Sequence, residues 1–204
     1  MSVGLLDHLK VSRRGVITPY VLLPGDPGRV DDMGKHLKRP EVRQFNREFK
    51  LLTGLYRGIP ITICSTGIGC PSTAIATEEL IDGGAQVLIR VGTCGGAWRE
   101  NIPNGSLVIA TASIRDEGTT HEYIPEGFPA VADFTVVSAI AKAATERNIP
   151  YFIGINRTHD AFYGSQDAIT KWGRYLLDER WRERGVDTPI LSSEMESAAL
   201  FVIA

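Results

Sequence analysis

The stretch from Val87 to Trp98, VLIRVGTCGGAW, places a charge inside a short apolar run that ends in a glycine-rich turn. The run predicts a buried strand, and the glycines predict that the chain turns directly after it. Arg90 lies inside this strand, where a guanidinium needs a negatively charged partner. Thr93 follows among glycines that leave backbone amides uncovered. Two interpretations remain: an anion site formed by Arg90 and Thr93, or an arginine paired with a core carboxylate beside glycines that only turn the chain.

The order of apolar runs and breaks predicts an α/β fold. A helix expected over 71–82 separates a strand at 60–65 from the strand at 87–90, and this β-α-β unit predicts parallel pairing. Arg57-Gly58 predicts a hairpin between the strand at 60–65 and one at 49–56. Further strands are expected at 20–23, 106–114 and 151–155, further helices at 134–147 and 169–184, and a short helix or irregular arm at 2–18.

Composition excludes several classes of partner. A net charge of −2 gives no electrostatic reason to expect binding to nucleic acid or to an acidic membrane surface. Apolar runs of membrane-spanning length are absent from the sequence, and its first residues do not resemble a secretory signal. Cys64, Cys70 and Cys94 are odd in number and lack close paired spacing, which argues against a disulfide framework or a zinc site and favours a reducing cytoplasm.

A second candidate anion site follows the strand expected at 20–23. Asp26 is predicted to cap a helix that starts at Pro27, which by itself explains the turn. The alternative is a phosphate site, because a strand, Gly25, and a helix N-terminus with Arg29 in its first turn are typical of one. The pattern is not G-x-G-x-x-G, and the acidic residue that would bind a dinucleotide ribose is missing, so we expect no Rossmann cofactor site.

Two later stretches carry candidate substrate residues. The end of the strand expected at 151–155 leads to Phe162 and Tyr163, which suit a flat heterocycle but are equally typical of a core. Gln166 follows and offers an amide for hydrogen bonding. In Ser193-Glu194-Met195-Glu196, the spacing of the serine and the second glutamate is that of a helix capping box. Alternatively, the two acids and the methionine between them contact a small ring-shaped substrate.

The stretches GDPGRV, NREF, STGIGCPST, IRVGTCGG, FPAVADF, DAFY and SEMESA occur in the order that they have in the nucleoside phosphorylase family. The chain resembles this family, of the uridine phosphorylase and hexameric purine nucleoside phosphorylase type, over nearly its whole length, and is closest to its uridine branch. The resemblance implies a single α/β domain over residues 1–204, with a mixed, partly barrel-like central sheet flanked by helices. We expect the family's last strand and C-terminal helix to be missing, since the sequence stops at Ala204.

The resemblance also implies an activity and the residues that perform it. The activity is that of a pentosyltransferase of nucleoside salvage, the reversible phosphorolysis of a nucleoside to free base and ribose 1-phosphate, with uridine first and a purine nucleoside or methylthioadenosine second. The catalytic positions are Arg90, Gln166 and Glu196. The phosphate-binding positions are Gly25, Arg29, Arg90, Thr93 and, lent by the adjacent subunit, Arg47. The nucleoside-binding positions are Thr93, Phe162, Gln166, Glu194, Met195, Glu196 and, reaching the ribose 5′-hydroxyl across the interface, His8.

Partners follow from the same resemblance. Inorganic phosphate is the co-substrate and no organic cofactor is expected; Glu48, Ile68 and Ser72 match positions that hold a potassium ion at a dimer interface. The expected assembly is a homo-oligomer with a dimer as active unit, in a hexamer built as a trimer of dimers. A nucleosidase, which uses water, would not need the expected arginine cluster, and a non-catalytic relative would be expected to lose it.

One departure from the family leaves undecided which base the substrate nucleoside carries. Uridine phosphorylases carry an arginine two residues after the base-site glutamine, and this chain has Ala168 there. Purine-type members use an aspartate that lies beyond the end of this sequence. The sequence therefore does not decide between uracil and a purine.

Overall fold

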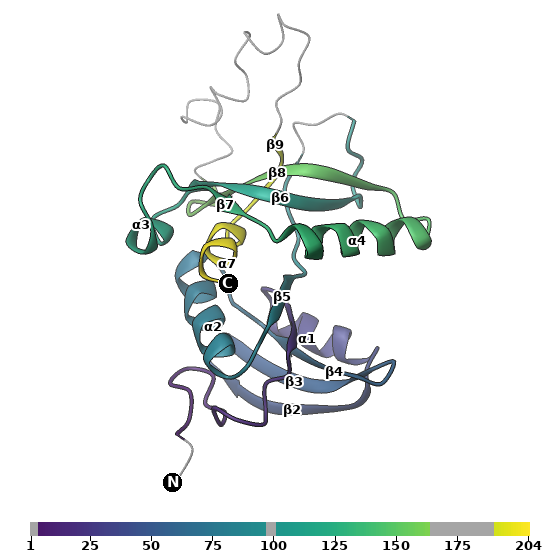
Figure 1. Ribbon diagram of the computed structural model, residues 1–204, viewed down its shortest axis with the longest axis vertical. Helices are drawn as coiled ribbons and strands as arrows, with labels where there is room; N and C mark the ends of the chain where they lie inside the picture. The colour runs from purple at the N-terminus through teal and green to yellow at the C-terminus, as the bar shows by residue number, and fades with distance from the viewer. Residues whose placement is uncertain (1–3, 97–100, 164–189) are drawn as a thin grey trace, which may run out of the picture. The chain divides into compact units, whose positions relative to one another are not determined.

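The computed structural model describes residues 4–96, 101–163 and 190–204, which belong to two compact units (Figure 1). The first unit comprises Met1–Thr93 with Ile203–Ala204, and the second comprises Cys94–Val202. The predictions for Gln166, for Ala168 and for a helix at 169–184 lie outside the described residues. Among the helices that are described, none combines the length and the apolar character needed to cross a bilayer.

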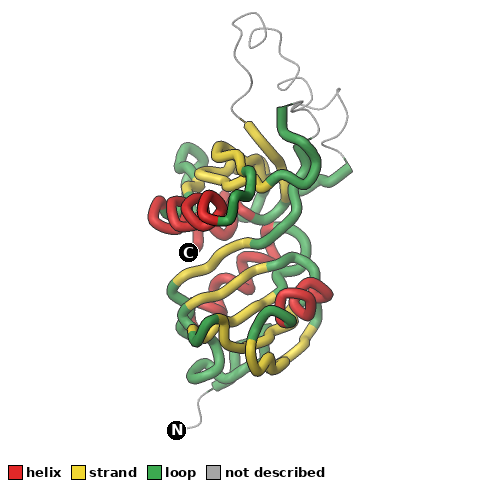
Figure 2. The backbone as a smooth tube through the Cα atoms, turned by 90° about the vertical axis from the view of Figure 1, so that its right-hand side faces the viewer, coloured by secondary structure: helices red, strands yellow, loops and turns green. Residues whose placement is uncertain are grey.

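The first unit contains a five-stranded mixed sheet with the strand order β2-β3-β4-β1-β5. Figure 2 draws the strands in yellow and the helices in red. Strand β1 pairs in parallel with both β4 and β5, and β2, β3 and β4 follow one another as antiparallel hairpins. The β-α-β pattern predicted the parallel direction of β4 and β5 correctly, but the two strands do not pair directly, because β1 lies between them. The strands are β1 Tyr20–Leu23, β2 Lys38–Asn46, β3 Phe49–Tyr56, β4 Ile59–Cys64 and β5 Val87–Arg90; the helices are α1 Pro27–Gly34 and α2 Cys70–Asp82.

Helix α1 begins where the sequence predicted it. Asp26 caps it, since Asp26 Oδ1 accepts a hydrogen bond from the Gly28 amide at 2.8 Å, and proline occupies the first turn. Val30 of α1 packs with Leu52 and Ile63 of the sheet, and all three side chains are almost fully buried. Each such burial contributes ~1.5–3 kcal/mol relative to exposure. The cap and this cluster fix the direction in which α1 leaves β1.

The second unit contains a four-stranded mixed sheet with the order β7-β6-β8-β9. Strands β6, β8 and β9 are parallel, and the short β7 pairs antiparallel with β6. Asp133 caps α4 as predicted, accepting from the Val136 amide at 2.9 Å. The strands are β6 Leu107–Asp116, β7 Ala130–Val131, β8 Tyr151–His159 and β9 Ile190–Glu194; the helices are α3 Thr120–Tyr123, α4 Phe134–Glu146 and α7 Ser197–Ile203.

The predicted mixed α/β architecture is confirmed, and the described strands form open sheets rather than a closed barrel. Four strands differ from prediction. Strands β2, β7 and β9 were not predicted, and β8 continues to His159 instead of ending near residue 155. The extension of β8 carries Asn156 and Thr158, which are buried polar residues. Hydrogen bonds to other residues of the second unit offset the cost of burying them.

Candidate active site

Two parallel strands of the first unit end at the same edge of their sheet and bring Gly25 close to Arg90. Leu23, the last residue of β1, pairs in register with Arg90, the last residue of β5. The turns that follow both strands therefore leave the sheet side by side, at the edge where open α/β sheets bind ligands. Gly25 is buried, and a Cβ placed on it would lie only 3.2 Å from the Gly67 carbonyl oxygen. This close approach favours glycine at position 25.

Two guanidinium groups converge on this glycine. A Cβ on Gly25 would lie 3.5 Å from Nη2 of Arg90 and 3.8 Å from Nη2 of Arg29, the third residue of α1. An anion beside Gly25 can accept charge-assisted hydrogen bonds from both side chains. The N-terminus of α1 adds a partial positive charge at the same place. Of the two interpretations of Arg90, this arrangement favours an anion site.

The position of the Arg90 side chain depends on its neighbours in the first unit. Its Nη1 donates to Thr66 Oγ1 at 3.3 Å. Its guanidinium lies against Gly92, where an added Cβ would come within 3.2 Å of Nε. Gly92 and Thr93 are both exposed, so a small anion can reach the backbone of the turn as well as the guanidinium.

The turn between β2 and β3 carries Arg47 and Glu48. Arg47 is exposed and has a φ of 54°, a left-handed conformation that is strained for an arginine. Glu48 contacts Ser72, another position matched to the potassium site: Ser72 Oγ donates to Glu48 Oε1 at 2.9 Å. Gly67 makes this contact possible, because a Cβ on it would lie 2.6 Å from Glu48 Cγ, and its φ is +74°.

Glu48 and Ser72, two of the three positions matched to a potassium site, are therefore in contact. Ser72 Oγ also lies within hydrogen-bonding distance of the Thr66 carbonyl oxygen, and Ile68, the third position, is 79% exposed. Carboxylate, hydroxyl and carbonyl oxygens are the ligands that hard cations prefer, so this donor set fits the ion. In the described ranges, no three His, Cys, Asp or Glu side chains are placed to hold a metal ion together.

In the second unit, Glu194 performs the capping that the sequence assigned to its neighbours. Its Oε2 accepts hydrogen bonds from the amides of Glu196 and Ser197 at 2.8 Å, at the start of α7. The predicted capping box of Ser193 and Glu196 is wrong, because β9 runs through Ser193 and α7 begins only at Ser197. Ser193 Oγ lies 3.1 Å from Nε2 of His159 instead.

The other oxygen of Glu194 is also engaged. Its Oε1 accepts from Asn156 Nδ2 at 2.8 Å and from Thr158 Oγ1 at 2.7 Å, both of them on β8. Glu194 thus joins β8, β9 and the first turn of α7. Glu196 precedes α7 and is only 5% exposed.

Phe162 and Tyr163 follow β8 and are exposed. Phe162 is 56% exposed and Tyr163 is 84% exposed, and their rings meet edge to face at 5.2 Å. They are therefore not core residues, which removes the alternative that the sequence left open. His159 precedes them; burial and the nearby Arg157 lower its pKa below the ordinary histidine value. His159 is thus mainly neutral at pH 7.

A cysteine nucleophile finds no support in the thiols. Burial raises the pKa of Cys64 to about 12 and also raises the pKa of Cys94. Both thiols are protonated at neutral pH, and a protonated thiol is a poor nucleophile.

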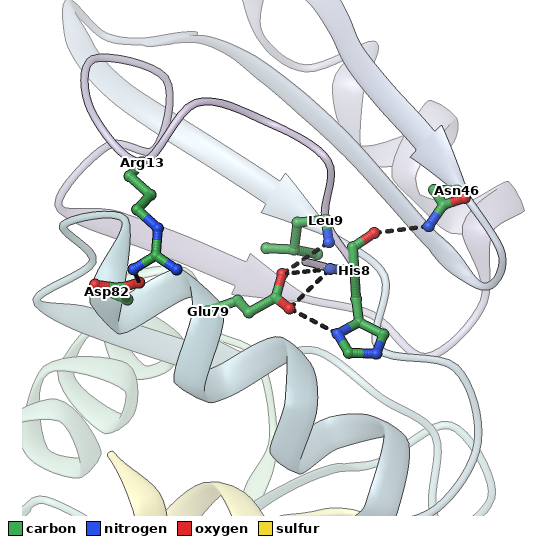
Figure 3. A network of polar contacts seen from close by, with 6 residues as sticks. All are labelled: His8, Leu9, Arg13, Asn46, Glu79 and Asp82. Carbon is green, nitrogen blue, oxygen red and sulfur yellow. Dashed lines mark hydrogen bonds and ion pairs between the residues drawn. The ribbon is translucent and has the colours of Figure 1, made fainter. Parts of the chain in front are cut away.

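Several supporting residues were not predicted from the sequence. Thr66 contacts Arg90, and Asn156 and Thr158 contact Glu194. Glu79 on α2 contacts His8, which the sequence alone would leave as a solvated surface residue (Figure 3). The alternation of Asn156 and Thr158 along β8 is a period-two signal that would have placed both on one face of the strand. It does not reveal the partner on the next strand.

Comparison with known proteins gives consistent results for sequence and fold. A family model described as "Phosphorylase superfamily" matches residues 19–204. The uridine phosphorylase of Treponema pallidum is 45% identical over 184 residues, which are 90% of this chain and 70% of that protein. The guanosine phosphorylase of Halorubrum lacusprofundi is 38% identical over 197 residues, 97% of this chain and 76% of that protein. The crystal structure of uridine phosphorylase from Vibrio fischeri ES114 matches with a TM-score of 0.86 at 35% identity, covering 100% of this chain and 80% of that one.

Proposed function

Because the chain belongs to the phosphorylase superfamily, we propose that it is a nucleoside phosphorylase that cleaves uridine with inorganic phosphate. The products are uracil and ribose 1-phosphate. The observation that carries this proposal is the convergence of Arg29 and Arg90 on Gly25. A nucleosidase uses water and has no need of two guanidinium groups beside one glycine.

In the proposed reaction, Arg29, Arg90, the Gly25 amide and Thr93 bind the phosphate dianion. A phosphate oxygen attacks C1′ of the ribose while the bond from C1′ to the base nitrogen breaks, and the bonding electrons leave with the base. Positive charge develops on the sugar ring during this step, as in other glycosyl transfers. The bound dianion is both the nucleophile and a counter-charge for that ring.

Other residues are proposed to bind the nucleoside. The Glu196 carboxylate accepts from the ribose 2′- and 3′-hydroxyls and orients the sugar for attack. Met195 lies against the sugar, and Phe162 stacks on the base. Gln166 donates to the departing base, whose negative charge needs a hydrogen-bond donor. Glu194 contributes to nucleoside binding by holding the start of α7 in place.

A purine nucleoside is the second candidate substrate. It is supported by the relative named guanosine phosphorylase, which is 38% identical to this chain, and by Ala168, which stands where uridine phosphorylases carry an arginine. Uridine remains the first candidate substrate, because the chain is 45% identical to a protein named uridine phosphorylase.

The proposed active unit is a dimer, within a hexamer built as a trimer of dimers in the cytoplasm. Each subunit lends Arg47 to its neighbour's phosphate and His8 to its neighbour's ribose 5′-hydroxyl. Glu48, Ile68 and Ser72 hold potassium at the interface. The exposure of Arg47 and the contact between Glu48 and Ser72 support these two assignments.

The first test is an assay of uridine, thymidine, inosine, guanosine and methylthioadenosine, with and without phosphate. Uridine cleavage is expected only with phosphate, releasing one ribose 1-phosphate for each uracil. Cleavage that proceeds equally well without phosphate would contradict a phosphorylase. Cleavage of guanosine or inosine without cleavage of uridine would make the purine nucleoside the substrate.

The strained turn gives a second test, the replacement Arg47→Gly. Glycine relieves the left-handed strain, so we expect the free energy of unfolding to rise by ~0.5–1 kcal/mol. The KM for phosphate is expected to rise ~10-fold or more, because a charge-assisted hydrogen bond is lost. Thermal unfolding and phosphate saturation kinetics measure the two effects.

Arg57→Gly is the matched control for this variant. Arg57 also has a left-handed φ, of 50°, and lies in the hairpin between β3 and β4. It should give a similar gain in stability with no change in the KM for phosphate. An unchanged phosphate KM in Arg47→Gly would show that Arg47 only forms its turn.

A further inference from the structure

The N-terminal arm, residues 4–14, contacts α2 through two carboxylates, of which Glu79 holds His8 and Leu9 (Figure 3). Glu79 Oε1 accepts from the His8 amide at 2.8 Å and from the ring nitrogen Nδ1 of His8 at 2.7 Å. Glu79 Oε2 accepts from the Leu9 amide at 2.8 Å. The side chain of Leu9 is only 1% exposed. One carboxylate therefore holds both the backbone and the ring of His8.

The opposite side of His8 is held by the β2–β3 hairpin. Asn46 Nδ2 donates to the His8 carbonyl oxygen at 2.8 Å, and the His8 ring meets the ring of Phe49 edge to face at 6.5 Å. Contacts from two elements fix the direction of the His8 side chain. That side chain remains 41% exposed, whereas that of Glu79 is 14% exposed.

The contact with Glu79 also selects the form of the ring. A carboxylate accepts hydrogen bonds and does not donate them, so Nδ1 of His8 must carry the proton. In the neutral ring, Nε2 then has a lone pair and accepts a hydrogen bond. Nε2 lies on the side of the ring away from Glu79, as Figure 3 shows.

We propose that Glu79 is a positioning residue for the reaction: it holds His8 as the Nδ1–H tautomer, so that Nε2 accepts from the ribose 5′-hydroxyl in the neighbouring subunit. This inference rests on the proposed function, because His8 needs a nucleoside to act on. Glu79 itself does not touch the substrate.

The test is Glu79→Gln in the full chain, with uridine and 5′-deoxyuridine compared at saturating phosphate. Glutamine keeps the shape of glutamate but leaves a single acceptor oxygen for the three donors that two carboxylate oxygens now serve, it lacks the negative charge that favours Nδ1–H, and its NH₂ group cannot accept from the donor it faces. We expect kcat/KM for uridine to fall ~10-fold, with less than ~2-fold change for 5′-deoxyuridine, which lacks the hydroxyl. An equal fall with both substrates, or no fall with either, would overturn the proposal.

Two further variants separate positioning from general loosening of the arm. Asp82→Asn removes the ion pair between Arg13 of the arm and the last residue of α2, and should leave the ratio of the two substrates unchanged. His8→Ala should lose the preference for uridine, and adding Glu79→Gln to it should produce no further loss. If the two substitutions lowered kcat/KM for uridine independently in the double variant, Glu79 would not act through His8.

Nitrogen NMR of His8 tests the tautomer without substrate. In the neutral ring, wild-type His8 should carry its proton on Nδ1. In Glu79→Gln, the proton should shift toward Nε2. An assay in which wild-type protein does not cleave uridine would defeat the proposed function, whereas a wild-type ring protonated on Nε2 would defeat the role of Glu79.

Discussion

Arg90→Ala is expected to lower kcat/KM for phosphorolysis by ~10²–10³-fold, the size of effect seen when one preorganised donor to a reacting anion is removed. Arg90 ends β5 beside Gly25, and its guanidinium and that of Arg29 approach the same glycine. The loss should appear in the KM for phosphate as well as in kcat, because the same contact binds the nucleophile and balances charge on the sugar. Saturation kinetics with phosphate at fixed uridine measures both.

Arg90→Lys refines this experiment. Lysine keeps the charge but lacks the planar fork that binds two oxygens, so activity between those of wild type and Arg90→Ala is expected. Arg57→Ala, which removes an exposed arginine from a hairpin of the same unit, serves as the control and should retain normal kinetics. If the KM for phosphate did not change in Arg90→Ala, the anion at this turn would not be the reacting phosphate.

The second large effect separates two glutamates that lie two residues apart. Glu194→Ala is expected to lower the free energy of unfolding by ~3–5 kcal/mol, because its donors lose a charged acceptor and two of them are buried side chains. For a chain of this length, that corresponds to a fall in Tm of ~10 °C. Thermal unfolding followed by circular dichroism measures it.

Glu196→Ala is expected to show the reverse pattern. Its kcat/KM for uridine should fall by ~10²-fold or more, since two charge-assisted hydrogen bonds to the ribose are lost. Its Tm should fall less than that of Glu194→Ala. Two variants with the same ratio of lost stability to lost activity would contradict the separate roles assigned to the two carboxylates.

Local signals in the sequence predicted much of the fold. The caps at Asp26 and Asp133 and the hairpin at Arg57-Gly58 depend on a few adjacent residues, and the structure confirms all three. Strand β2, with the sequence KRPEVRQFN, was missed because it is polar on both faces and contains a proline. Such a composition is tolerated at a sheet edge, where one side of the strand has no partner.

The candidate site was predictable where its residues are neighbours in sequence or share a turn. Gly25 and Arg29 belong to one strand–helix turn, and Arg90 is conspicuous as a charge in an apolar run. The capping box failed because it depends on where β9 ends, and moving that boundary by a few residues assigns the cap to a different side chain. The side chains on β8 that contact Glu194, and the Glu79 carboxylate that contacts His8, are distant in sequence, so no local pattern could identify them.

The register of β1 with β5 has a consequence for folding. Gly25 and Arg90 are far apart in the chain, with β2, β3, β4 and α2 between them, and they meet only when β5 docks beside β1. Loop closure over such a distance is slow compared with hairpin formation. The proposed anion site is therefore expected to form late in folding, and a nascent chain should have no phosphate affinity there until β5 has been synthesised. Phosphate bound at this site would stabilise only the completed sheet, and so would favour native over unfolded chains.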